Sequence, residues 1–84
     1  MVVTRVQRFA RFCDLTGASS NDLLGEYVNV LTARDHEFQN AHTRNRYAEL
    51  VLAMLTYVYG EDRREEALTE VYRVQKEQEN SNAA

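Results

Sequence analysis

A run of almost uninterrupted apolar residues, 47–59, is the feature that most constrains how this chain can fold. Between Leu50 and Tyr59 the only polar side chain, apart from the tyrosines, is that of Thr56. Residues at spacings of three and four form one apolar face, and further apolar residues cover most of the remaining circumference. A helix that is apolar all round is normally buried all round, so we expect a helix over residues 43–59 at the centre of the fold.

The composition favours helix along the whole chain. Its 84 residues include no proline and only three glycines, so little would interrupt a helix. The apolar periodicity predicts an all-α domain, a compact bundle of four helices that occupies residues 1–79. The polar residues 80–84 are expected to fray as a C-terminal tail. The predicted helices cover about residues 4–16, 21–34, 43–59 and 61–78.

Local signals mark the ends of these helices. Gly17 is expected to end the first helix in a left-handed conformation, which glycine adopts without a steric penalty. Ser19 and Asp22 have the spacing of a capping box, which predicts the start of the second helix. Gly25, inside that helix, costs helix stability and therefore indicates close approach of another helix. Thr43 is the expected N-cap of the third helix.

The connection between the second and third helices, residues 35–42, loses the helical period. We expect Phe38 to anchor it, and His36 and His42 to be exposed within it. Cys13 lies on the apolar stripe of the first helix and is expected to be a packed core residue. These three potential ligands lack the close pairing of zinc sites, so no metal site is predicted.

No pattern in the sequence predicts a catalytic site. The scattered glycines form no phosphate-binding loop. The acidic residues between 61 and 66 fall at a helix start, where they complement the helix dipole, and their spacing matches no calcium loop. We therefore predict a protein that is not an enzyme and has no cofactor.

The size of the chain makes its core marginal. A domain this small buries only about 60–65% of its extended surface. Cys13 is the only cysteine, so no disulfide can form within the chain.

The sequence has no apolar leader, and its longest apolar run, residues 50–55, is far shorter than the roughly 20 residues that span a bilayer. We expect a soluble, cytoplasmic protein without membrane contact.

The five tyrosines can be interpreted in two ways. Their rings could surround the core of a monomer with the hydroxyls at the surface, or they could form an interface with another protein. The two-sided apolar helix favours a small non-enzymatic regulator or adaptor that acts through protein–protein contacts, as a homodimer or with another protein. The predicted interface residues are Tyr47, Leu50, Met54, Tyr57, Val58, Tyr59 and Tyr72.

Five arginines form a second candidate site. If the starts of the first and third helices lie side by side, their guanidinium groups would form a patch for phosphate or for an acidic partner. The alternative is a solvated face balanced by acidic residues, which the net charge of −3 favours. The patch would make the chain a DNA-binding accessory protein of a phage or mobile element. Its residues are Arg5, Arg8, Arg11, Arg44 and Arg46.

The segment 43–47 (Thr-Arg-Asn-Arg-Tyr), followed by residues 55–60 (Leu-Thr-Tyr-Val-Tyr-Gly), resembles the end of the core-binding domain of tyrosine recombinases and integrases. Upstream, residues 8–12 (Arg-Phe-Ala-Arg-Phe) are similar to the family's first helix, and residues 21–31 to its short second helix. The resemblance covers residues 4–60 and implies a compact, SAM-like helical fold with DNA binding. It does not include the catalytic domain, so it implies no recombinase activity. Core-binding domains that clamp DNA are usually basic, and this chain is acidic.

Overall fold

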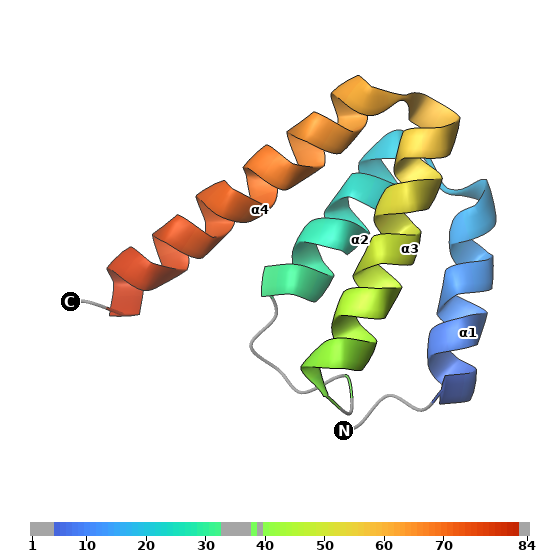
Figure 1. The fold of residues 1–84 in the computed structure, drawn as a ribbon, viewed down its shortest axis with the longest axis horizontal. Coiled ribbons are helices and arrows are strands. Elements are labelled where there is room, and N and C mark those ends of the chain that lie inside the picture. The colour runs from blue at the N-terminus through green and yellow to red at the C-terminus, as the bar shows by residue number, and fades with distance from the viewer. Residues whose placement is uncertain (1–4, 33–37, 39, 83–84) are drawn as a thin grey trace.

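The chain folds into four α-helices, which confirms the predicted all-α class. The computed structural model describes residues 5–32, 38 and 40–82, and the side chains of residues 10–32, 38 and 40–80. No β-strand occurs within those residues. A short 3₁₀ turn, Leu15–Gly17, follows the first helix. The helices are α1 (Arg5–Asp14), α2 (Ser20–Thr32), α3 (Ala41–Tyr59) and α4 (Glu61–Asn82) (Figure 1).

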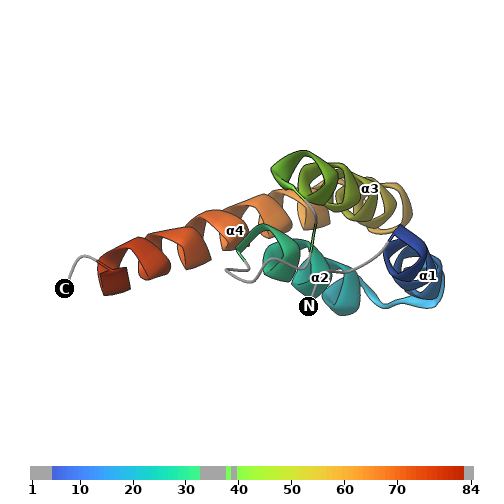
Figure 2. The same cartoon turned by 90° about the horizontal axis from the view of Figure 1, so that it is seen from below.

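The helices form a flat arrangement rather than a closed cylinder. α2 runs antiparallel to both α1 and α3, and α4 leaves the end of α3 at an oblique angle (Figure 1). Seen end-on, α1 and α4 lie on opposite sides of the α2–α3 pair (Figure 2). The molecule measures 40 × 32 × 18 Å along its principal axes. α4 accompanies α2 as far as Gln78, whose side-chain amide donates a hydrogen bond to the carbonyl of Thr32 (3.0 Å).

The core lies where α2, α3 and α4 meet. Val51 and Leu55 of α3 are completely buried, and they pack with Leu23 of α2 and Ala67 of α4. α1 adds the half-buried Phe12 at the edge. The remaining core residues are Tyr27, Val28, Val30, Phe38, Tyr47, Ala48 and Val71.

Two of the predicted local signals are confirmed. The hydroxyl of Ser19 accepts a hydrogen bond from the Asp22 N–H (3.2 Å), and the Asp22 carboxylate accepts one from the Ser19 N–H (3.3 Å), so the capping box forms. Phe38 is buried, with its ring centroid 5.5 Å from that of Tyr47. It therefore anchors the connection before α3, of which residues 35–37 and 39 lie outside the described part.

The predicted helix ends are wrong at two places. α3 begins two residues early because Asn40, not Thr43, is its N-cap: the Asn40 side chain accepts a hydrogen bond from the Thr43 N–H (2.8 Å). α4 continues through residues 80–82, which were expected to fray. Ion pairs one turn apart support its exposed half, where Arg73 pairs with Glu70 and Glu77. The hydrogen bond from Arg73 lowers the pKa of the Glu70 carboxyl.

Glycine is needed at a different position from the one predicted. The chain leaves α1 through the 3₁₀ turn, closed by a hydrogen bond from the Ala18 N–H to the Leu15 carbonyl (3.0 Å), and Gly17 has no positive φ. Among the described residues, Gly60 alone has a positive φ, +99° with ψ 173°. This conformation is essentially restricted to glycine, and it redirects the chain from α3 into α4.

Two packing predictions are also wrong. A Cβ atom built at Gly25 would meet nothing within 4 Å, so no other helix approaches there. Cys13 is exposed, because Phe12 of α1 and Leu15 of the 3₁₀ turn pack against the core in its place. Val6 and Phe9 share the stripe of Cys13 by their spacing of three and four residues, and their side chains lie outside the described part.

Substituting Gly25 by alanine is expected to stabilise the protein by about 0.5–1 kcal/mol. The position is inside a helix and has free space for the added methyl group. Urea denaturation of the two proteins, followed by far-ultraviolet circular dichroism, measures the difference.

The same substitution at Gly60 provides the control. Because φ is positive there, Gly60→Ala should destabilise the protein by about 1–3 kcal/mol, although the added methyl group meets no atom within 4 Å. Equal effects at the two glycines would contradict the described geometry of the α3–α4 turn.

Candidate functional site

α3 has a buried face and an exposed face of similar apolar character. Leu50 is 50% exposed and Tyr57 is 92% exposed, and both lie on the side of the helix away from Val51 and Leu55. The spacing of three and four residues places the exposed Ala53 and the half-buried Met54 between them on that side. We call Leu50, Ala53, Met54 and Tyr57 the outer face of α3.

The expectation that this helix is buried all round is wrong for a single chain. α2 and α4 both pack against the same side of α3, because their own apolar stripes meet at Val51 and Leu55. α1 borders α3 laterally (Figure 2). Among the helices that the structure describes, none covers the outer face.

The predicted interface residues therefore divide into three groups by their burial. Tyr47 is only 5% exposed and packs against Phe38, so it belongs to the core of the chain itself. Met54 is half-buried. The other five are exposed: Leu50, Tyr57, Val58, Tyr59 and Tyr72.

The tyrosines divide between buried and exposed positions. Tyr27 is buried with Tyr47, and burial raises the pKa of the Tyr27 hydroxyl. Tyr59 is partly exposed and donates a hydrogen bond to the Ala18 carbonyl (2.9 Å), which ties the end of α3 to the turn after α1. Tyr72 lies on α4, with the Lys76 ammonium 5.5 Å from its ring centroid. Tyr57 alone presents almost its whole ring to solvent from the outer face.

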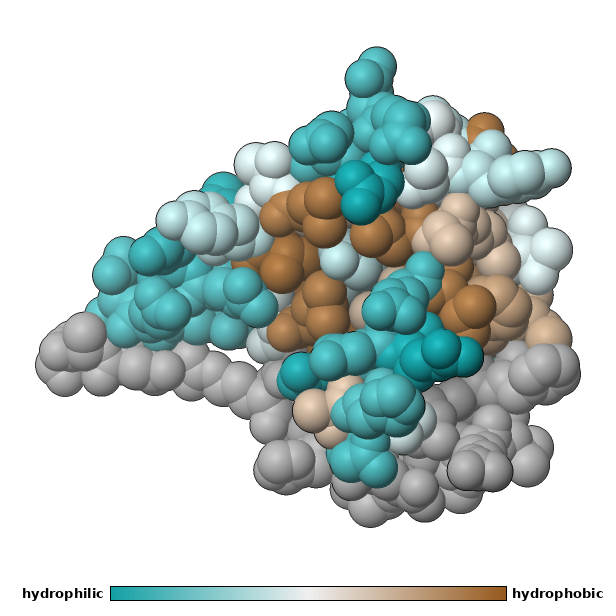
Figure 3. All heavy atoms as spheres, viewed as in Figure 1, coloured by the Kyte–Doolittle hydropathy of each residue, from teal (hydrophilic) through white to brown (hydrophobic). Residues whose placement is uncertain are grey.

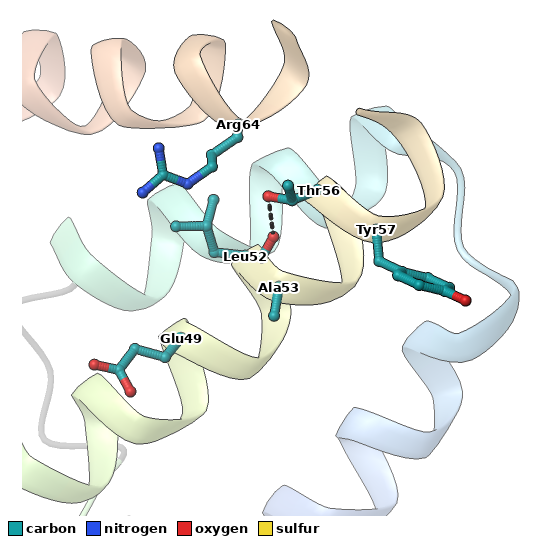
Figure 4. Close-up of a pocket in the computed structure, with 6 residues that line it drawn as sticks. All are labelled: Glu49, Leu52, Ala53, Thr56, Tyr57 and Arg64. Atoms are coloured by element: carbon teal, nitrogen blue, oxygen red, sulfur yellow. Dashed lines mark hydrogen bonds between the residues drawn. The ribbon is translucent and has the colours of Figure 1, made fainter. Parts of the chain in front are cut away.

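A shallow groove between α3 and α4 extends this exposed apolar surface. Arg64 of α4 reaches toward Leu52 of α3, whereas Tyr57 projects from the opposite side of α3 (Figure 4). The Thr56 hydroxyl donates to the Leu52 carbonyl (2.8 Å), so it is satisfied within the helix. The groove is open to solvent and suits a protein side chain better than an enclosed small molecule. Its lining residues are Glu49, Leu52, Ala53, Thr56, Tyr57 and Arg64.

Apolar and hydrophilic residues are segregated on this side of the molecule. On the face shown, apolar residues gather between α4 and α3 and over α2, and hydrophilic residues lie above them, to their left and across the lower part of α3 (Figure 3). An apolar centre with a polar rim is the usual anatomy of a protein interface.

The sequence prediction missed Ala53 and Arg64. Ala53 could have been found, because it lies three residues after Leu50 and four before Tyr57. Arg64 could not, because its approach to α3 depends on the turn at Gly60 and has no signal in the local sequence pattern.

The five predicted arginines have different surroundings. α1 and α3 do begin at the same end of the molecule (Figure 1). However, the Arg11 guanidinium forms an ion pair with Glu26 of α2 (3.1 Å), and the Arg44 guanidinium donates to Asn45 (3.4 Å). Arg46 is exposed. The side chains of Arg5 and Arg8 lie outside the described part.

Within the described residues, no three His, Cys, Asp or Glu side chains are close enough together to hold a metal ion. His42 is exposed at the start of α3, and His36 lies outside the described part. None of the described helices is both long and apolar enough to cross a membrane.

No protein-family model, curated protein or solved structure matches this chain. The resemblance to the core-binding domain of tyrosine recombinases therefore stays a prediction. The candidate site rests on the geometry of α3 alone.

Two leucines on α3 test the contrast between its faces. Leu55→Ala should destabilise the chain by about 2–5 kcal/mol, because it leaves a cavity among completely buried neighbours. Leu50→Ala should cost less than about 1 kcal/mol, because that side chain is already half exposed. Urea denaturation at low protein concentration, where association contributes least, measures both. Similar losses at the two positions would contradict the exposure of the outer face.

Proposed function

We propose that this chain is a small non-enzymatic adaptor or regulator that acts through protein–protein contact and assembles as a homodimer. The observation that carries the proposal is the exposure of Leu50 and Tyr57 on a helix whose opposite face forms the core. A contiguous exposed apolar surface with a polar rim is typical of an interaction site.

The exposed surface is large enough for association. The exposed parts of Leu50 and Tyr57 amount to roughly 300 Å² per chain, since one aromatic side chain alone presents about 150–250 Å². Two copies would bury about 600 Å² there, and with flanking residues about 1,000 Å², the lower end of specific interfaces. At about 25 cal/mol per Å², 600 Å² contributes on the order of 15 kcal/mol, against an association cost of about 4–15 kcal/mol.

The small core gives association a second role. Three helices enclose only one side of α3, and a chain of 84 residues has few further apolar residues with which to extend that core. Covering the outer face would bury the central helix on both sides and raise the free energy of unfolding of each chain.

The alternative, a DNA-binding accessory protein, has less support. The net charge is −3, and Arg11 is engaged by Glu26. Phosphate contacts would give an affinity that falls steeply with salt. A titration with duplex DNA at two salt concentrations tests this alternative independently of any dimer.

Placing a charge on the outer face should dissociate the dimer without unfolding the chain. Leu50→Asp and Tyr57→Asp each place a carboxylate where the interface would exclude water, and neither position contributes to the core. Sedimentation velocity over a range of micromolar concentrations should show a dimer for the wild type and a monomer for both variants. Circular dichroism checks that both remain helical.

Thr69→Asp is the matched control, because Thr69 is an exposed residue of α4 away from the outer face. It should leave the dimer unchanged. A wild-type chain that sediments as a monomer at every concentration would refute the homodimer.

A further inference from the structure

The two ends of the outer face of α3 carry opposite charges. Arg46 lies four residues before Leu50, and hence on the same side of the helix. Glu61 and Asp62 are the first residues of α4, which the chain enters through the turn at Gly60 at the other end of α3. All three side chains are exposed. The apolar outer face is therefore bounded by a cation at one end and by two carboxylates at the other.

These three charges have no ion-pair partner among the described side chains. Most other described cations do: Arg63 pairs with Glu66, Arg64 with Glu65 and Lys76 with Glu79, each within α4. Arg11 and Arg73 are also paired with carboxylates. The charges that the chain leaves unpaired thus include those at the two ends of its exposed apolar surface.

We propose that the outer faces of α3 from two copies pack antiparallel about a twofold axis, with Arg46 of each copy against Glu61 and Asp62 of the other. This arrangement rests on the proposed function and specifies its partner as a second copy of the chain. A twofold interface requires a surface complementary to itself. In that arrangement Leu50 of each copy faces Tyr57 of the other, and Arg46 lies at the end of the contact where the partner's α4 begins with Glu61 and Asp62.

The centre of the contact suits close packing. In this register Leu50 of each copy faces Tyr57 of the other, and Ala53 faces Met54 at the twofold axis. The small Ala53 side chain lets the helices approach, and Met54 is flexible enough to fill the remaining space. Tyr57, the most exposed large apolar residue, becomes the main anchor.

Charge and dipole both select the antiparallel direction. A parallel pair would bring the two Arg46 side chains together at one end and the two Glu61 side chains together at the other. An antiparallel pair instead places the carboxylates near a guanidinium at both ends, and it also opposes the two helix dipoles.

The register is selected by the same residues. Sliding the helices by one turn in one direction moves Leu50 past Tyr57 to the partner's α3–α4 turn. Sliding them by one turn in the other direction places Arg46 against Tyr57 and Leu50 against Ala53. Either shift separates an apolar side chain from its apolar partner.

Charge reversal tests the arrangement. Arg46→Glu and Glu61→Arg should each weaken the dimer by about tenfold or more at low salt, because each reversal changes two symmetry-related contacts. The double variant R46E/E61R should recover most of the wild-type dissociation constant, since the pairs form again with exchanged signs. Sedimentation equilibrium at low and high salt gives these constants, and high salt should reduce the differences.

Recovery in the double variant is the decisive result. In a parallel pair it would juxtapose like charges again and would not recover. Glu61→Arg also removes a favourable charge at the start of α4, so thermal unfolding of each variant is measured separately. The double variant keeps that loss of stability, and its recovered association therefore reports the contact itself.

Lys76→Glu and Glu79→Arg provide a matched control pair, because these residues form an exposed ion pair on the free part of α4. They should leave the dissociation constant unchanged. A dimer that Leu50→Asp dissociates but that neither charge reversal weakens would overturn this arrangement and leave the proposed function standing. A monomeric wild type would overturn both.

Discussion

The fold depends on the burial of one side of α3. Val51 and Leu55 have no exposed surface, and they belong to one core cluster with buried residues of α2 and α4. α2 and α4 each have a single apolar stripe, and each stripe is buried in this contact. Because α4 contacts α3 and α2 together, it lies on the side of α3 that carries Val51 and Leu55. The apolar side chains of Leu50 and Tyr57, on the other side of α3, thereby stay exposed among the described residues.

The polar contacts around the core hold this geometry in place. The Tyr59 hydroxyl fixes the end of α3 to the turn after α1, and the ion pair between Arg11 and Glu26 fixes α1 to α2. Both keep α1 beside the α2–α3 pair, where it does not cover the outer face (Figure 2). The positive φ of Gly60 sends α4 to the opposite side. The exposure of Tyr57 is thus a consequence of the topology and not of one loose side chain.

The sequence predicts the parts of this structure that depend on neighbouring residues. The number of helices follows from apolar periodicity, and the start of α2 follows from the reciprocal bonding of Ser19 and Asp22. The failures concern contacts between distant segments. Cys13 shares an apolar stripe with Phe12, but only the approach of the other helices decides which of them is buried. Tyr47 and Tyr57 look equivalent on an apolar helix, yet one packs on Phe38 and the other faces solvent.

The fold of one chain gives no reason for apolar side chains at positions 50 and 57. Lysine or glutamate there would favour the helix about as well as leucine and better than tyrosine, and would leave the core untouched. Burial of apolar surface supplies affinity but little orientation, whereas charges at the rim select direction and register. The outer face combines the two, with Leu50 and Tyr57 between a basic and an acidic end. A surface of that form is complementary to its own reversed copy, which is the requirement for a closed twofold pair rather than an open chain of molecules.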